Sequence, residues 1–239
     1  MWSVDLTLPT PQQNLACDEA LVDWCEQGRD EEILRFWESP GYFVVLGYSS
    51  KAAAEVNLSA CRRNRFPILR RCSGGGAVAQ GPGCLNYSLI LRIADRAPLK
   101  GITETNNFIM RRHKEALEPV LGAGVAIQGF TDLALGLRKF SGNAQHRKRR
   151  FVLFHGTLLL DFDIPRMDEL LPLPSRQPAY RQNRPHRDFL VNLEAPASVI
   201  KEVLKKSWNV TGALEKIPLE KIDDLVESRY GRKEWNFKF

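Results

Sequence analysis

Two different hydrophobic periods alternate along this chain and predict a mixture of helices and strands. Apolar residues three and four positions apart indicate helices, whereas short apolar runs bounded by glycine, proline or asparagine indicate strands. The helical pattern covers residues 12–27, 57–63, 103–121, 165–171, 196–208 and 219–230. The strand pattern covers residues 2–8, 33–38, 43–47, 66–71, 85–93, 125–128, 132–135, 138–141 and 151–160.

A glycine-rich segment with two arginines interrupts this pattern after residue 69. It reads Arg70-Arg71-Cys72-Ser73-Gly74-Gly75-Gly76-Ala77-Val78-Ala79. Glycine tolerates positive φ and lets the backbone approach a ligand closely, so that consecutive N–H groups can converge on one anion. Two guanidinium groups beside such a loop favour a clamp for a phosphate or a carboxylate. A tight turn between strands, with two solvated arginines, is the alternative that the segment alone leaves open.

Standard nucleotide-binding motifs fit this segment poorly. The spacing of Gly74, Gly76 and Ala79, with Asp95 near the ribose-binding offset, satisfies the loose dinucleotide fingerprint. That fingerprint requires a helix directly after the loop, whereas Gly81-Pro82-Gly83 breaks any helix and a strand pattern follows. The sequence contains no Walker loop. The segment therefore predicts an anion site built on glycines and strands.

Length, cysteine content and charge restrict the class of protein. The 239 residues are 44% hydrophobic and 26% charged, so we expect one domain over 1–239. No apolar run reaches the roughly 20 residues that span a bilayer. The five cysteines lack metal-ligand spacing, and we expect free thiols and a cytoplasmic protein. The net charge of +6 favours acidic partners, but no nucleic-acid-binding motif is present, and we expect the basic residues 146–150 at a hairpin tip.

Four further motifs accompany the arginine-glycine segment. Leu85-Asn86-Tyr87-Ser88 follows the glycines, and Asp132-Leu133 comes later. The last two motifs are Arg138-Lys139-Phe140-Ser141-Gly142-Asn143-Ala144-Gln145 and His155-Gly156-Thr157-Leu158-Leu159. In this order and spacing they resemble the lipoate-protein ligase and octanoyltransferase family, and the likeness covers nearly the whole chain.

The resemblance implies a fold and a reaction. The fold is α+β, that of biotin ligases and class II synthetases, with a large, mostly antiparallel mixed sheet flanked by helices. The reaction uses ATP and Mg²⁺ to convert lipoate, or octanoate, into an acyl-adenylate. A lysine of a lipoyl carrier domain then takes the acyl group. The expected protein partner is therefore an apo-lipoyl domain or a glycine-cleavage H-like protein, and neither nucleic acid nor a membrane is expected.

The resemblance also assigns roles to residues. Lys139 is the expected catalytic residue, bridging the acyl carbonyl oxygen and the α-phosphate, with Arg71 stabilising charge beside it. We expect Ser73 at the acyl carbonyl, and Asp132 at Mg²⁺ or the nucleotide unless it caps a turn. His155 and Gly156 are expected in the acyl pocket. The full set expected at substrate or ATP is Arg70, Arg71, Ser73, Gly74, Gly75, Gly76, Ala77, Val78, Ala79, Asn86, Asp132, Ser141, Gly142, Ala144, His155, Gly156 and Thr157.

Three alternatives stand beside the ligase. An octanoyl or lipoyl transferase takes its acyl group from a carrier thioester through a cysteine. The position where transferases of the closest type carry it reads Gln128-Gly129-Phe130-Thr131, although Cys72 and Cys84 flank the glycines. A biotin ligase is third, because its Gly-Arg-Gly-Arg loop is replaced by Ser73-Gly74-Gly75-Gly76. A non-catalytic binder of lipoyl domains is disfavoured by the retention of Arg71 and Lys139.

Two segments suggest how such a site is closed. Residues 172–187 are rich in proline and arginine and too polar for a core, so we expect a lid there. Bacterial-type ligases continue past a segment like Glu234-Trp235-Asn236-Phe237 into a small accessory domain, whereas this chain stops at Phe239. We therefore expect either a separate small accessory subunit or the use of preformed adenylate or carrier thioester.

Overall fold

The computed structural model describes residues 1–94, 96–122 and 124–239, so Asp95 lies outside the described residues. Among them, the large sheet has eight strands in the order β11-β1-β2-β6-β10-β9-β8-β7. β1 runs parallel to β11 and β2, and the other neighbours are antiparallel. Its strands are β1 (Trp2–Asp5), β2 (Ile33–Glu38), β6 (Cys84–Arg92), β7 (Val125–Gln128), β8 (Asp132–Leu135), β9 (Arg138–Arg147), β10 (Phe151–Leu159) and β11 (Gly212–Ala213).

A small sheet fixes both ends of the glycine segment. Its strands are β4 (Ile68–Arg70), β3 (Phe43–Leu46) and β5 (Val78–Gln80), in that order. β3 is parallel to β4 and antiparallel to β5. Residues 71–77, which we call the glycine loop, connect the two outer strands, so both of its ends depend on pairing with β3.

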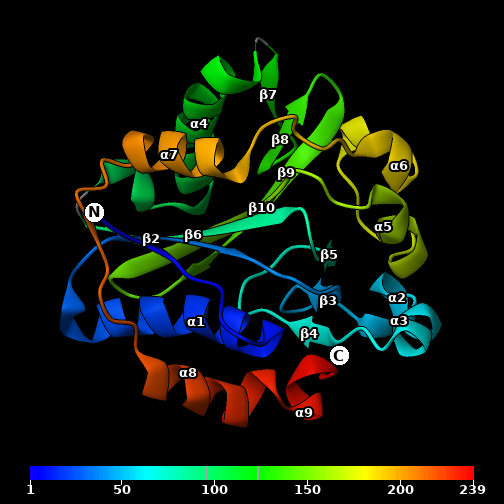
Figure 1. Cartoon of the computed structure of the whole chain (residues 1–239), viewed down its shortest axis with the longest axis horizontal. Helices are drawn as coiled ribbons and strands as arrows, with labels where there is room; N and C mark the ends of the chain where they lie inside the picture. The colour runs from blue at the N-terminus through cyan, green and yellow to red at the C-terminus, as the bar shows by residue number, and fades with distance from the viewer. Residues whose placement is uncertain (95, 123) are drawn as a thin grey trace.

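Helices cover both faces of the large sheet (Figure 1). In this view α1, α8 and α9 lie below the sheet, α4 and α7 lie above it, and α2, α3, α5 and α6 gather near the small sheet. The α+β fold class expected from the sequence is confirmed. The helices are α1 (Pro11–Trp24), α2 (Ala52–Glu55), α3 (Leu58–Asn64), α4 (Ile102–Leu121), α5 (Ile164–Leu170), α6 (His186–Phe189), α7 (Ala197–Ser207), α8 (Leu219–Leu225) and α9 (Lys233–Asn236). π-helical turns extend α1 over Cys25–Arg29 and α8 over Val226–Tyr230, and 3₁₀ turns cover Ala97–Leu99 and Ala179–Arg181.

The central strand β6 shows why the strands read as continuous apolar runs. Leu85 and Tyr87 belong to the core cluster that includes residues of α4 and α7, whereas Ile90 belongs to the cluster that includes α1. A strand with both faces covered needs apolar residues on both. Asn86 and Ser88 interrupt the α1 face with polar groups, and the cavity described below lies at this end of the sheet.

Most predicted elements are confirmed within a few residues. β2, β7 and β8 have the predicted bounds, and Asn57 caps α3 by accepting a hydrogen bond from the backbone N–H of Ala60. β9 is longer than predicted because it pairs with β10 as far as Arg147. The first strand ends at Asp5, and β11 pairs with its outer edge. The elements that prediction missed, such as β5 and α9, have two to four residues, too few to show a period. No helix in the described part of the chain has the length and apolar character needed to span a membrane.

Arg70 ties β4 to the end of the chain. Its side chain is fully buried, and Nη1 donates to the carbonyl oxygens of Gly47, Tyr48 and Ser50 at 2.8, 2.9 and 2.8 Å. Nε and Nη2 donate to two carbonyl oxygens of α9 at 3.1 and 2.9 Å. Every guanidinium nitrogen is therefore bound to backbone. In this structure the guanidinium thus holds β4 to the end of β3 and to α9, and the expectation that Arg70 contacts substrate or ATP stays a prediction.

We expect Arg70→Ala to lower the free energy of unfolding by about 3 kcal/mol or more, because each buried carbonyl left without a donor costs about 1–3 kcal/mol. Denaturation in guanidinium chloride measures the change. Arg63→Ala, at an exposed position of α3, is the matched control and should change stability by less than about 0.5 kcal/mol. Equal stabilities of the two variants would contradict the structural role of Arg70.

Candidate active site

A cavity of about 280 Å³ lies between the glycine loop, the large sheet and residues 171–189. Most of the predicted site residues line it: Arg71, Gly75, Gly76, Ala77, Val78, Asn86, Asp132, Lys139, Gly142, Ala144, His155, Gly156 and Thr157. The structure does not bring the other predicted residues to its wall, namely Arg70, Ser73, Gly74, Ala79 and Ser141. Ala79 and Ser141 are buried, at 2% exposure each.

The strand register brings these distant motifs together. Residues directly opposite each other on antiparallel strands point to the same face of a sheet. One row crosses β2, β6, β10, β9 and β8 through Trp37, Asn86, Thr157, Gly142 and Asp132. The next row on that face holds Arg35, Ser88, His155 and Ala144.

The glycine loop has its carbonyl oxygens bound by the protein. Arg71 Nη2 donates to the carbonyl oxygens of Gly74 and Gly76 at 2.5 and 3.0 Å, and Ser50 Oγ donates to that of Gly75 at 3.1 Å. All three glycines are exposed, and no hydrogen bond between described residues uses their N–H groups. The loop therefore presents free N–H donors, as an anion site requires.

Two glycines are required by this geometry. Gly75 has a φ of +89°, which an L side chain rarely adopts. A Cβ on Gly47 would lie 1.9 Å from the carbonyl oxygen of Gly75, so only glycine allows the end of β3 to approach the loop. Both positions hold the loop against the small sheet.

The side chain of Arg71, the first residue of the glycine loop, lines the cavity. Burial lowers its pKa to about 10, so the guanidinium is charged at neutral pH. Its Nε and Nη2 bind groups of residues 73–76, and Nη1 has no hydrogen-bond partner among the described residues. Arg71 thus stabilises the loop and keeps one free donor group for a ligand.

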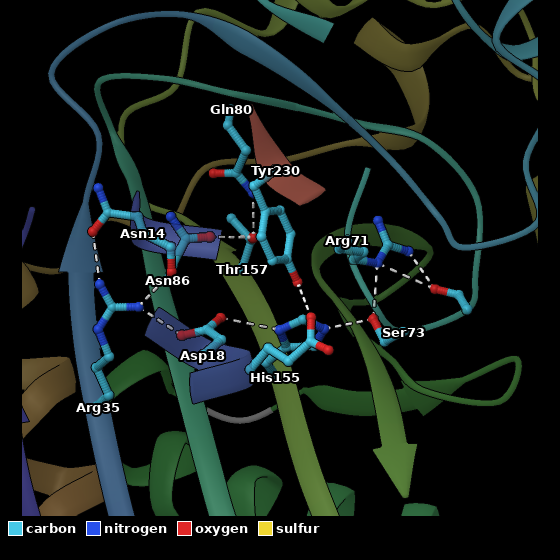
Figure 2. Close-up of polar contacts among 12 residues, drawn as sticks. Asn14, Asp18, Arg35, Arg71, Ser73, Gln80, Asn86, His155, Thr157 and Tyr230 are labelled. Carbon is cyan, nitrogen blue, oxygen red and sulfur yellow. Dashed lines mark hydrogen bonds and ion pairs between the residues drawn. The ribbon is translucent and has the colours of Figure 1, made fainter. Parts of the chain in front are cut away.

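Behind Arg71, a hydrogen-bonded chain runs through Ser73 and His155 to Asp18 (Figure 2). Ser73 Oγ accepts from Arg71 Nε at 3.0 Å and lies 2.6 Å from His155 Nε2, while His155 Nδ1 lies 3.1 Å from Asp18 Oδ2. An ionised carboxylate only accepts, so we assign the hydrogen to Nδ1, and Nε2 then accepts the hydroxyl hydrogen of Ser73. The oxygen and hydrogen of Ser73 are both engaged. Ser73 therefore links Arg71 to His155 in this structure, and the expected bond to the acyl carbonyl stays a prediction.

The same order of groups occurs in the Ser-His-Asp triads of hydrolases. Here Ser73 is 1% exposed, does not line the cavity, and accepts a hydrogen bond from a guanidinium. The hydrogen-bonded series from Arg71 to Asp18 therefore serves to orient side chains.

Arg35 balances the buried charge of Asp18. Its Nη1 lies 2.6 Å from Asp18 Oδ1, and its Nη2 donates to Asn14 Oδ1 at 2.6 Å. Burial raises the pKa of Asp18, but the charge of Arg35 and the hydrogen bond with His155 outweigh it, so that the pKa falls below its ordinary value. Asp18 is therefore an ionised group in the core, beside the cavity.

A second ion pair joins Lys139 and Asp132 on the opposite side of the cavity. Lys139 Nζ lies 2.8 Å from Asp132 Oδ1, and the hydroxyl of Tyr180 donates to Asp132 Oδ2 at 2.8 Å. A Cβ on Gly142 would lie 2.7 Å from Nζ, so the lysine crosses over a residue that must lack a side chain. Asp132 therefore holds Lys139 in the cavity.

Gly156 is explained by a side chain that crosses it. A Cβ there would lie 1.7 Å from Asn143 Oδ1. Asn143 accepts from the hydroxyl of Tyr87 at 2.6 Å and donates to the carbonyl oxygen of Thr131 at 2.7 Å. The glycine lets this network form in the cavity wall.

Polar side chains continue along the sheet towards β5. Gln80 Nε2 donates to Thr157 Oγ1 at 2.6 Å, and this hydroxyl donates to Asn86 Oδ1 at 2.6 Å (Figure 2). All three residues line the cavity. Hydrogen bonds therefore join side chains of β5, β10 and β6 to one another in this wall.

None of the cysteines lines this cavity, and the expectation of free thiols is confirmed. All five are buried. Burial raises the pKa of Cys17 to about 11 and those of Cys25 and Cys84 to about 12. It also raises the pKa values of Cys61 and Cys72. The cavity thus contains no thiolate beside Lys139.

Prediction from sequence missed part of the cavity wall. Asp18 lies on the buried face of α1 and Arg35 within an apolar strand, and the charge of Arg35 inside that apolar run was the available signal. Asn143 was inside a quoted motif but had no role. Residues 171–189, which include the expected lid, form the outer wall through Leu171, Pro172, Pro174, Arg176, Pro178, Arg181, His186 and Phe189. Whether this segment moves is still a prediction.

Comparison with known proteins identifies the family. Residues 10–216 match the family described as lipoyl protein ligase A/B catalytic domain. Because the match covers most of the chain, this protein belongs to that family. The fold is likewise that of solved lipoate and biotin ligases, as expected from the motifs.

Individual relatives are named for two different reactions. The chain is 27% identical to "Probable lipoate-protein ligase A" of Mycoplasma pneumoniae, over 95% of this chain and 68% of that protein. It is 26% identical to the octanoyltransferase LipM of Geobacillus kaustophilus, over 95% of this chain and 94% of that protein. A solved bi-partite lipoate protein ligase from Thermoplasma acidophilum superposes with a TM-score of 0.78 at 23% identity, over 99% of this chain and 96% of that one. Membership of the family therefore does not choose between ligase and transferase.

We expect Asp18→Asn to destabilise the protein by about 3–5 kcal/mol at neutral pH, because Arg35 loses its buried partner. The folded pKa of Asp18 lies below the ordinary value of 3.8, so its contribution is present above that pH and disappears as the pH falls through the folded pKa. The stability difference between wild type and variant should therefore shrink in acid. Denaturation at neutral and acidic pH measures it, with Asp223→Asn at an exposed position as the control. A difference that stays constant with pH would contradict this account.

Proposed function

We propose that this protein is a lipoate-protein ligase, which activates lipoate or octanoate as an acyl-adenylate and attaches the acyl group to a lysine of a lipoyl carrier domain. One observation supports this best: the free N–H groups of the glycine loop, Arg71 and Lys139 meet at one cavity that no cysteine lines. Such donors suit a phosphate group, whereas a thioester route needs a thiol.

The first step joins the acid to the nucleotide. A carboxylate oxygen attacks the α-phosphorus of ATP, the bond between the α-phosphorus and the bridging oxygen breaks, and pyrophosphate leaves with the electron pair. Negative charge on the α-phosphate oxygens is greatest during this displacement. Fixed donors aimed at that charge lower the barrier because they need no reorganisation. The loop N–H groups and Arg71 supply them, and Lys139 adds a point charge at the acyl oxygen.

The second step transfers the acyl group. The neutral amine of the acceptor lysine attacks the carbonyl carbon, the bond from that carbon to the bridging oxygen breaks, and AMP leaves with this oxygen. The amine gives up one proton to solvent. Lys139 stabilises the negative charge that develops on the carbonyl oxygen, and Asp132 and Tyr180 keep its Nζ in place.

Mg²⁺ does not fit this cavity as a resident ion. No group of three histidine, cysteine or acidic side chains in the described residues is arranged to hold a metal. Both carboxylate oxygens of Asp132 already contact Lys139 or Tyr180. We therefore assign Mg²⁺ to the phosphates of the nucleotide, which is its usual place in such enzymes, and derive no step from it.

A transferase is the second candidate, and the likeness to octanoyltransferase LipM is the observation that favours it. It would need a cysteine at the acyl group. Cys72 is the thiol within the glycine loop, but it is 6% exposed, and burial raises its pKa far above neutrality. The thiolate route is therefore costly in this conformation.

The proposed partner is an apo-lipoyl domain or a glycine-cleavage H-like protein. The Thermoplasma ligase is bi-partite by its own description. By analogy we include a separate accessory subunit in the proposal, needed for forming the adenylate but not for using it.

The test measures, by mass spectrometry, whether an apo-lipoyl domain gains an acyl group in each of three reactions. One reaction contains lipoate or octanoate with ATP and Mg²⁺, a second contains synthetic acyl-adenylate, and a third contains an octanoyl carrier thioester without nucleotide. We expect acylation from the adenylate, and from ATP once any accessory subunit is supplied. The double variant Cys72→Ser, Cys84→Ser should keep this activity. Acylation from the thioester alone that the double variant loses while still folded would establish the transferase instead.

We expect Lys139→Ala to reduce the acylation rate by about 100-fold or more while the fold persists, because the cavity loses a fixed charge and little packing. Lys139→Arg should not restore the rate, since a planar fork does not place a point charge at the same position. Single-turnover rates and circular dichroism measure both effects. Arg138→Ala, at the exposed neighbouring residue outside this cavity, is the control. A near-wild-type rate in Lys139→Arg would refute the role.

A further inference from the structure

Arg181 is a buried arginine that lines the cavity and carries a buried donor group with no hydrogen-bond partner among the described residues. It is 4% exposed, and the donor group is its Nη2. The nearest candidate carboxylates are engaged elsewhere, because Asp132 pairs with Lys139 and Asp168 pairs with Arg187. Burying an unpaired charge is costly, so a binding site is where such a group is expected.

Its guanidinium is held rigidly. Nε donates to the carbonyl oxygen of Arg184 at 3.1 Å, and the guanidinium carbon lies 4.6 Å from the ring centre of Phe189. Arg184 in turn donates to the carbonyl oxygen of Leu137, at the β8–β9 turn, at 2.9 Å. These contacts fix the side chain without using Nη2.

The neighbouring residues place Arg181 on the Lys139 side of the cavity. Tyr180 binds Asp132, the partner of Lys139, and the backbone N–H of Val191 donates to the carbonyl oxygen of Lys139 at 3.0 Å. Gly129 supports the same turn, since a Cβ there would lie 3.3 Å from Pro178. The segment that carries Arg181 is thus anchored on the strands that carry the ion pair.

The charges of the cavity then fall into two groups. Arg71 and the loop N–H groups form one donor set, and Arg176 and Arg181 form another on the outer wall. The buried carboxylate of Asp18 is neutralised by Arg35, and that of Asp132 by Lys139. A monocarboxylic acid brings one charge and occupies one set. Two sets suit a polyanion with linked phosphate groups.

We propose that Arg181 binds the β- and γ-phosphates of a nucleoside triphosphate, the part that leaves as pyrophosphate, while Arg71 and the glycine loop bind the α-phosphate. This inference rests on the proposed ligase function. A guanidinium suits the task because its fork binds two phosphate oxygens at once. Arg181 would also stabilise the charge that the leaving group gains when its bond to the α-phosphorus breaks.

The experiment is calorimetric titration of the wild type, Arg181→Gln and Arg181→Lys with MgATP, pyrophosphate, AMP and octanoate. We expect Arg181→Gln to weaken binding of MgATP and pyrophosphate by at least about tenfold, the effect of losing one charged hydrogen bond. AMP and octanoate should bind as they do to the wild type. Arg181→Lys should keep part of the affinity for pyrophosphate, and it serves as the folded substitute if Arg181→Gln is unstable.

Arg63→Gln is the matched control, because Arg63 is exposed on α3 and does not line this cavity. It should bind all four ligands like the wild type. Wild-type affinity for MgATP and pyrophosphate in Arg181→Gln would overturn this inference alone. An equal loss of all four ligands would also overturn it, since that indicates general collapse of the cavity. Failure of the wild type to bind MgATP, with its accessory subunit present, would overturn the proposed ligase itself.

Discussion

Two adjacent arginines, whose side chains point in different directions, hold the glycine loop in the conformation on which the site depends. Arg70 faces the core and binds five carbonyl oxygens that join the end of β3 and α9 to the strand before the loop. Arg71 faces the cavity and binds two carbonyl oxygens of the loop itself. Once the carbonyl oxygens are bound, the N–H groups of the glycines are left for a ligand. Under the proposed function, the affinity of the loop for an anion therefore depends on these contacts within the protein.

The second constraint is that each buried carboxylate near the cavity carries its own cation. Arg35 keeps Asp18 ionised, which fixes the tautomer of His155 and, through Ser73, the position of Arg71. Lys139 pairs with Asp132 on the opposite wall. Arg71, Arg176 and Arg181 line the cavity without an ion pair in the described chain, and under the proposed function these groups attract the anionic substrate. An incoming phosphate thus meets charges already in place.

The sequence predicted the parts of this site that local pattern determines. Strand periods gave β2, β7 and β8, and the quoted motifs contain Arg71, Lys139, Asp132 and His155, which the register brings to one cavity. It could not predict that Arg70 faces away from the cavity, because this depends on α9, 165 residues later in the chain. The partners of Asp18 and Arg181 are likewise set by packing between elements, and a period within one element carries no information on that.

The central claim is that this cavity activates a carboxylic acid as an adenylate, and the fate of a carboxylate oxygen tests it most directly. Octanoate labelled with ¹⁸O in its carboxylate is supplied with ATP, Mg²⁺, an apo-lipoyl domain and any accessory subunit, and the AMP produced is analysed by mass spectrometry. Attack on the α-phosphorus predicts AMP that carries one ¹⁸O, because the bridging oxygen stays with the phosphate when the amine takes the acyl group. Acylated lipoyl domain formed with unlabelled AMP, or with no AMP, would contradict the account.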